Sequence, residues 1–92
     1  MPKIFTIMGY VIYFWSNENY EPIHVHVAKG ALRPNATKVW LTKSGGCVLE
    51  KRQDDVAQKD LNELMEIIAA QHFLICLHWK KHHRVDTIKF YC

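Results

Sequence analysis

The first half of the chain carries short hydrophobic runs separated by polar or glycine-containing turns. Runs rich in β-branched and aromatic residues occupy residues 4–8, 10–15, 37–42 and 47–50. Gly9 separates the first two runs and suits a bulge or a bend, whereas Gly45 and Gly46 supply the tight turn that a hairpin needs between the last two. This pattern predicts β-strands over all of these segments.

A further run alternates strictly between aliphatic residues and histidine. Pro22 stops any helix and begins an extended stretch, and the aliphatic residues of segment 23–27 share one face of the predicted strand. His24 and His26 share the opposite face, about 6–7 Å apart along the strand. We therefore expect two imidazole rings to emerge together from the surface of a sheet.

The second half of the chain changes to a helical period. Apolar residues, together with one histidine, recur at spacings of three and four and form one stripe: Leu61, Leu64, Met65, Ile68, His72, Ile75, Cys76 and Trp79. Asp54 or Asp55 suits the N-cap position, and Gln58 completes a capping box with Asp55. The pattern predicts one long helix that ends near residues 80–83, whose basic side chains suit the negative end of the helix dipole.

Other apolar residues of this segment lie off the stripe, so we expect the middle of the helix to be largely buried. They are Ile67, Phe73, Leu74 and Leu77. Residues 88–91 favour a short final strand. The expected fold is α+β, an antiparallel meander of about four to five strands packed against one long C-terminal helix, with a short final strand. A length of 92 residues predicts a single domain over residues 1–92.

Composition and charge narrow the class of protein. Hydrophobic residues make up 49% of the chain and the formal net charge is +3, which indicates a globular protein without the dense positive surface of a dedicated nucleic-acid protein. The three cysteines are widely spaced without a CxxC pair and are expected to be reduced thiols. The longest apolar run, residues 10–15, is too short to span a bilayer, and no signal segment is recognisable. We therefore expect a cytoplasmic protein without membrane contact.

His24 and His26 are the strongest candidates for chemistry. Two imidazoles on one strand face can share a metal ion or act as a catalytic acid and base, and they also suit a structural role as hydrogen-bonded polar residues. A metal ion would need a third ligand from a set that no spacing narrows: His72, His78, His82, Cys47 or Glu21. The metal ligands therefore stay unknown. No glycine-rich loop precedes the helix to cradle a phosphate, and we expect no cofactor.

The predicted helix ends in a basic run. It comprises Lys80, Lys81, His82, His83 and Arg84. Such cations are commonly solvated at a helix end, and the same groups can contact the phosphates of RNA or DNA, or an acidic partner protein. His78 and His82 lie four residues apart on one helix face, but Trp79 occupies the position where a zinc protease carries its glutamate, which excludes that class.

The N-terminal third of the chain resembles a known family. The matching residues are Met1-Pro2-Lys3-Ile4, Gly9-Tyr10-Val11-Ile12-Tyr13-Phe14 and Glu21-Pro22-Ile23-His24-Val25-His26-Val27. In this order they are similar to a family of small bacterial proteins known as domain of unknown function number 4160. The resemblance implies a signature of Gly9, Pro22, His24 and His26. It also implies a bacterial cytosolic protein. The genes of such proteins often lie beside a gene for a second small protein, in an arrangement like that of toxin–antitoxin pairs.

Residues and resemblance together lead to three hypotheses. The first is a binding or regulatory protein, one partner of a toxin–antitoxin-like pair, whose working surface is the His24/His26 strand face. The second is a small metal-independent RNase-like toxin in which His24 and His26 act as acid and base while Lys80, Lys81 and Arg84 hold phosphates. The third is a metal-binding domain without catalysis. The expected partner is a small protein, or alternatively RNA or another phosphate-bearing ligand, and both enzymatic activity and oligomeric state stay open.

Overall fold

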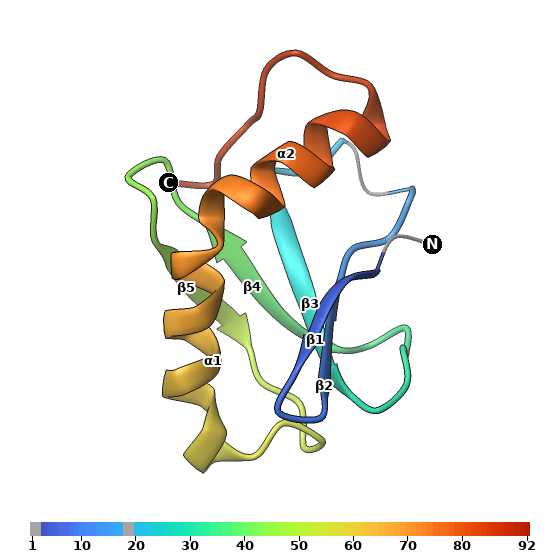
Figure 1. Cartoon of the computed structure of the whole chain (residues 1–92), viewed down its shortest axis with the longest axis vertical. Coiled ribbons are helices and arrows are strands. Elements are labelled where there is room, and N and C mark those ends of the chain that lie inside the picture. Colours follow the sequence, from blue (N-terminus) through green and yellow to red (C-terminus); the bar gives the residue numbers. More distant parts are fainter. Residues whose placement is uncertain (1–2, 18–19) are drawn as a thin grey trace.

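The computed structural model describes residues 3–17 and 20–92, which form one antiparallel sheet and two helices (Figure 1). The strands are β1 (Lys3–Ile7), β2 (Tyr10–Tyr13), β3 (His24–Lys29), β4 (Thr37–Leu41) and β5 (Cys47–Lys51). They lie in the order β1-β2-β3-β4-β5, so each strand pairs with its neighbour in the chain and β1 and β5 form the two edges. The predicted α+β class and the antiparallel meander are confirmed.

The β1–β2 hairpin closes through the two residues Met8 and Gly9, because Ile7 pairs directly with Tyr10. Both turn residues have positive φ angles, 57° at Met8 and 82° at Gly9, which is the requirement of a type I′ turn. Gly9 therefore supplies a turn at the bend predicted between the two runs. The register shift of this pair lies at the other end of β1, between Lys3 and Phe5.

The prediction of one long helix is wrong, because the helical segment is divided at Gln71. α1 (Gln58–Ala70) ends there and α2 (His72–His83) begins, with Gln71 at φ −99° and ψ 18°. The hydrophobic stripe continues across the break, since Ile68 of α1 and Ile75 of α2 are both fully buried. A periodic hydrophobic pattern indicates which side chains face the core, but it does not indicate whether the helix axis is continuous. Two helices that pack on the same core can therefore share one pattern although their axes point in different directions. Figure 1 shows α2 turned away from the axis of α1 and crossing the end of β3.

The predicted caps of the helix are also wrong. The N-cap residue of α1 is Ala57, which makes no capping hydrogen bond through its side chain. Asp55 is engaged elsewhere, since its Oδ2 accepts the backbone N–H of Lys29 at 2.9 Å and its Oδ1 lies 3.2 Å from Nη1 of Arg33. The carboxylate that was expected to cap the helix therefore connects the segment before α1 to the end of β3.

The C-terminal segment forms no strand, so the predicted final strand at residues 88–91 is wrong. Hydrogen bonds nevertheless fix it to the sheet end: the carbonyl of Lys89 accepts the N–H of Ile23, and the carbonyl of Cys92 accepts the N–H of Lys43, both at 2.9 Å. Ile88 and Phe90 pack against the core. These isolated bonds do not make a ladder, which explains why β-prone residues here remain irregular.

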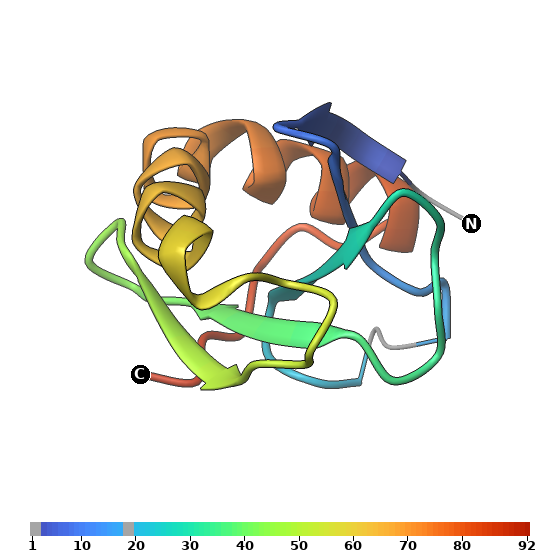
Figure 2. The same ribbon diagram turned by 90° about the horizontal axis from the view of Figure 1, so that it is seen from below.

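The main core lies between the two helices and one face of the sheet, and Figure 2 shows both helices on that side. The central residues of this core come from β2, β3 and β4 and from the inner sides of α1 and α2. A smaller cluster covers the opposite face, where Val11, Tyr13, Ala28 and Ala36 pack with Trp15 and Leu32. The middle strands are therefore buried on both faces. Within the described ranges, no helix is long and apolar enough to cross a membrane.

Candidate functional site

His24 and His26 lie on β3, and their rings lie close together as predicted. The ring centroids are 5.0 Å apart with an angle of 83° between the planes, so one ring meets the other edge-on. Their expected exposure is wrong, because His24 is 0% exposed and His26 is 5% exposed. The strand pattern predicted which residues share a face but contained no information on what covers that face.

Aromatic side chains from distant parts of the chain cover His24. Its ring lies 5.5 Å from Trp40, its partner on β4, and 5.5 Å from Trp79 of α2. Nδ1 of His24 lies 2.9 Å from the carbonyl oxygen of Pro22, and because a carbonyl can only accept, Nδ1 carries the proton. Pro22 therefore fixes the tautomer and the orientation of this imidazole.

His26 is enclosed on the same side of the sheet. Its ring centroid is 5.5 Å from that of Tyr13, the residue opposite it on β2. The Tyr13 hydroxyl donates a hydrogen bond of 2.8 Å to the carbonyl of Arg33, so the loop after β3 is tied over this face. The catalytic role of His24 and His26 stays a prediction, and a macromolecular substrate would reach them only after one of the covering side chains moved.

Lys38 and Glu21 form a partly buried ion pair next to the histidines, which the sequence reasoning did not pair. Their Nζ and Oε1 atoms are 2.7 Å apart, and the Lys38 ammonium lies 4.4 Å from the centroid of the Trp40 ring. Lys38 is also the partner of His26 on β4. The alternation of Lys38 and Trp40 along β4 was a sequence signal that these residues share one face.

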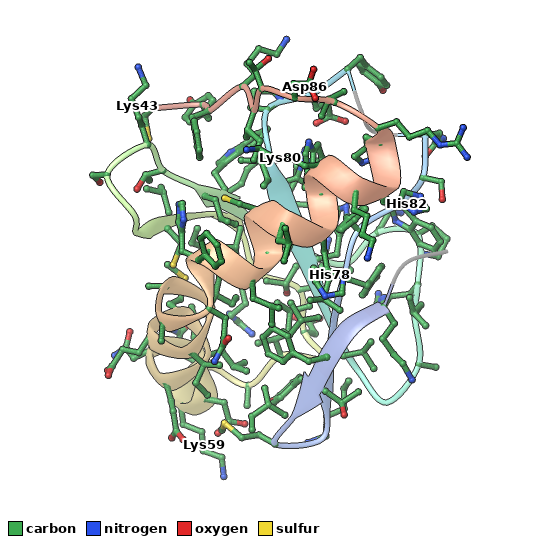
Figure 3. The ribbon with its side chains drawn as sticks, turned by 45° about the horizontal axis from the view of Figure 1, so that its top comes forward. Lys43, Lys59, His78, Lys80, His82 and Asp86 are labelled. Carbon is green, nitrogen blue, oxygen red and sulfur yellow. The ribbon has the colours of Figure 1, made fainter. Side chains whose placement is uncertain are left out.

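The basic run at the end of α2 separates into exposed and enclosed residues. Lys80, Lys81, His82 and Arg84 are exposed, whereas His83 is half-buried. Nε2 of His82 lies 2.9 Å from Oγ of Ser16, and Figure 3 shows His82 and Lys80 on α2. Arg84 ends the helix in the left-handed conformation at φ 57°.

Trp79 connects the two groups of residues that the sequence nominated. Its ring lies 5.5 Å from His24 on one side and 4.3 Å from His83 on another. Phe14 closes the cluster, 5.0 Å from Trp79 and 5.2 Å from His83. The histidine strand and the basic helix end are therefore parts of one continuous aromatic cluster, joined by a tryptophan that the sequence analysis did not assign to the site.

Among the residues described, no His, Cys, Asp or Glu side chains gather in a group of three or more that could hold a metal ion. Besides Glu21, which pairs with Lys38, and His82, which contacts Ser16, two further candidate third ligands make other contacts. His72 Nε2 lies 2.8 Å from the Thr42 carbonyl oxygen, and Sγ of Cys47 donates to the carbonyl of Met65.

The outer side of α2 carries a surface that the sequence analysis assigned to the interior. Phe73 is 81% exposed and Leu77 is 51% exposed, so the expectation of a largely buried middle is wrong for these residues. They line a groove of about 380 Å³, here called the α2 groove, formed by Phe73, Cys76, Leu77, Lys80, Thr87, Ile88 and Phe90. The sequence did contain a signal for this exposed surface: Phe73 and Leu77 are four residues apart, so they share one helix face, and both lie off the buried stripe.

Comparison with known proteins places the chain in a family. A family model described as a domain of unknown function (DUF4160) matches residues 9–80. The chain belongs to this family. No curated protein and no solved structure matches it.

The DUF4160 match extends from the turn of the first hairpin to the last third of α2. Gly9, Pro22, His24 and His26, the residues that the resemblance implied, all lie inside it. Phe73 and Leu77 also lie inside the match, whereas residues 81–84 of the basic run lie beyond it. Four of the seven residues that line the α2 groove therefore lie inside the match, whereas Thr87, Ile88 and Phe90 lie beyond it.

Proposed function

We propose that this DUF4160 protein is a protein-binding module, one member of a two-protein pair of the toxin–antitoxin type, and that it binds its partner at the α2 groove. The exposure of Phe73 and Leu77 carries this proposal. Contiguous apolar surface with a polar rim commonly marks an interaction site in a small protein. The histidine face, which the sequence favoured as the working surface, is covered in this conformation.

The inner side of α2 makes the helix a rigid platform for binding. Ile75 is 0% exposed and Trp79 is 3% exposed, so both are fixed in the core while Phe73 and Leu77 project outward. Covering a large apolar side chain contributes about 1.5–3 kcal/mol, so these two residues could supply a substantial part of a binding free energy. A preformed helix also loses little conformational entropy on association.

His24 has a supporting role in this proposal. Its ring contacts Trp79, and Trp79 anchors the C-terminal half of α2 to the sheet. The buried histidine therefore positions the binding helix without touching the partner. This role gives a reason for a histidine in the interior of the protein.

Co-expression with the product of an adjacent gene, followed by copurification, tests the proposal. We expect Phe73→Glu or Leu77→Glu to abolish copurification while circular dichroism and melting temperature stay unchanged, because both side chains are exposed. Val48→Glu is the matched control, since Val48 is an apolar residue of β5 that is 41% exposed and lies outside the α2 groove. Retention of the partner by both groove variants, or equal loss with Val48→Glu, would contradict the proposal.

A second candidate function is metal-independent RNA cleavage, with His24 and His26 as acid and base. The contact of Trp79 with both His24 and His83 favours it, because the buried histidines adjoin the basic end of α2 where phosphates could bind. The purified protein would be assayed for cleavage of single-stranded RNA. His24→Ala and His26→Ala should each abolish cleavage in protein that remains folded, and undiminished cleavage would exclude both residues as catalytic groups.

A further inference from the structure

We infer that the partner contacts the α2 groove with an acidic amphipathic helix. This inference rests on the proposed function and adds the chemistry of the binding segment. It is supported by three properties of the groove: the spacing of its apolar residues, the distribution of charge along α2, and a described lining that comes from a helix and an irregular segment and includes no strand.

The apolar part of the groove has the spacing of a helix–helix contact. Phe73 and Leu77 are four residues apart on α2, which separates them by about 6 Å along the axis. An opposing helix presents side chains at the same spacing through its own i and i+4 positions. Phe90 and Ile88 of the C-terminal segment form the other wall, so the opposing side chains would enter a groove and not a flat surface.

The charge of the α2 side chains changes from neutral to positive toward the C-terminal end of the helix. Lys80 lines the groove and Lys81 follows Leu77 by one helical turn, and both are exposed. α2 contains no aspartate or glutamate at any position. Asp86, in the segment after the helix, is an exposed acid near this end of the molecule (Figure 3). Lysines at the rim of an apolar contact favour a partner with carboxylates, which also accelerates association.

A helix suits this surface better than an added strand. The main-chain groups within α2 are hydrogen-bonded inside the helix, so α2 offers no free row of N–H and C=O groups for β-augmentation. From Phe73 to Lys81 the surface extends about 12 Å, or a little more than two helical turns. A partner helix with apolar residues at i and i+4 and glutamates one and two turns later would match both the apolar part and the basic part of this surface.

A synthetic amphipathic helix tests the chemistry directly. The probe is a peptide of about 14 residues with Leu at i and i+4 and Glu at i+7, i+8 and i+11, and the comparison peptide carries Gln at each Glu position. We expect the acidic peptide to bind about tenfold more tightly than the Gln peptide, measured by fluorescence anisotropy. The difference should decrease as the salt concentration increases.

Protein variants assign that binding to α2. Lys80→Gln combined with Lys81→Gln should weaken binding of the acidic peptide about tenfold and leave binding of the Gln peptide unchanged. Lys59→Gln is the control for the loss of one positive charge and is compared with Lys80→Gln and Lys81→Gln made singly. Lys59 is exposed and lies on α1 at the far end of the molecule (Figure 3). Equal weakening by Lys59→Gln would show a general charge effect and would overturn the inference.

A thiol footprint gives the position of the bound peptide. Cys76 lines the groove and is half-buried, whereas Cys92 is exposed and serves as an internal reference. The peptide should slow maleimide modification of Cys76 relative to Cys92. Unchanged modification of Cys76 at saturating peptide would place the peptide elsewhere and overturn the inference. Protection of Cys76 by single-stranded RNA, with displacement of the peptide, would overturn it in favour of a nucleic-acid ligand.

The same variants separate this inference from the proposed function. If the natural partner depends on Phe73 and Leu77 but is insensitive to Lys80→Gln, Lys81→Gln and salt, the acidic helix is wrong and protein binding at the groove stands. If the partner is retained when Phe73 and Leu77 are replaced by glutamate, the proposed function itself fails.

Discussion

His24 contributes to packing and to hydrogen bonding at the same position. Its ring fills the space between Trp40 and Trp79, and its Nδ1–H is bonded to the carbonyl of Pro22. Removal of the ring would leave a cavity and would take the hydrogen-bond donor from a partly buried carbonyl, and both changes are known causes of destabilisation. Loss of activity in a His24 variant would therefore need a separate measurement of folding before it could be assigned to catalysis.

We predict that His24→Ala lowers the free energy of unfolding by about 2–4 kcal/mol in urea denaturation. His78→Ala is the matched control, because His78 is an exposed histidine on α2 and its loss should change stability by less than about 0.5 kcal/mol. Similar effects for the two substitutions would mean that the packing around His24 is unimportant for stability.

Three buried or half-buried groups make the fold sensitive to alkaline pH. The N–H of Ala57 lowers the pKa of the Tyr10 hydroxyl, but burial and the hydrogen bond to the Asp60 carboxylate outweigh this effect and leave the pKa raised. Burial raises the pKa of the Cys47 thiol and of the Cys76 thiol, although Lys80 partly offsets the increase at Cys76. The folded state therefore favours the neutral form of all three groups.

The sign of the pH effect follows from these directions. A raised pKa in the folded state stabilises the protein below the unfolded-state pKa, and this stability is lost as pH increases toward the folded-state value. We predict that the free energy of unfolding decreases above about pH 9, where thiols and then tyrosines begin to ionise in the unfolded chain. Cys47→Ala and Tyr10→Phe should each flatten this decrease in urea titrations. A stability that is constant from neutral pH to pH 11 would contradict the assignment.

At the scale of elements, the turn of the first hairpin holds Met8 in a conformation that non-glycine residues rarely adopt. Type I′ turns favour Asn-Gly, and this chain has Met8-Gly9 with φ of 57° at the methionine. Met8 is 37% exposed, so its side chain contributes limited packing. The backbone geometry, and not the core, therefore determines which residue is best at this position.

We predict that Met8→Asn increases the free energy of unfolding by about 0.5–1 kcal/mol in urea denaturation. Met8→Val should decrease it, because a β-branched side chain is especially unfavourable at positive φ. Stabilisation by valine and not by asparagine would show that burial at this turn outweighs the backbone effect.

At the scale of the whole molecule, the C-terminal segment connects the stability of the fold with the proposed binding surface. Phe90 stacks on His72 of α2 with an angle of 10° between the rings, and it also forms one wall of the α2 groove. The same segment is bonded to the sheet end through Lys89 and Cys92. A change here should therefore affect folding and binding together.

We predict that Phe90→Ala lowers the melting temperature by about 8–30 °C, the shift that corresponds to a loss of about 2–4 kcal/mol for a partly buried aromatic residue in a domain of this size. The same substitution should weaken partner binding at a temperature where the variant is fully folded. Tyr91→Ala is the neighbouring control, since Tyr91 is 61% exposed and does not line the groove. Full binding by folded Phe90→Ala protein would remove this wall from the binding surface.

The sequence predicted the elements well because each depends on a local pattern. The runs around β1 to β5 and the stripe from Leu61 to Trp79 specify strands and helical turns without reference to distant residues. The break at Gln71 was not predictable in this way, since the stripe of buried residues continues on both sides of it. The irregular C-terminal segment was missed for a related reason: strand formation requires a partner ladder, and residues 88–91 have none.

The candidate site was predicted in part. The alternation at residues 23–27 correctly brought His24 and His26 together, but their burial depends on Trp40 and Trp79, which approach from β4 and α2. The exposure of Phe73 and Leu77 depends likewise on the direction in which α2 leaves Gln71. Proximity of residues two apart in a strand is a local property, whereas exposure is decided by the packing of remote elements.

Among the described strands, the first and the last of the meander each lack an outer neighbour. Unpaired strand edges are templates for aggregation, and charged side chains are a common protection against stacking of one molecule on another. Lys3 lies on β1, and Glu50 and Lys51 lie on β5, all with exposed side chains. Replacement of these residues by valine or isoleucine should therefore reduce solubility before it changes the melting temperature, so a poorly soluble edge variant can still be correctly folded.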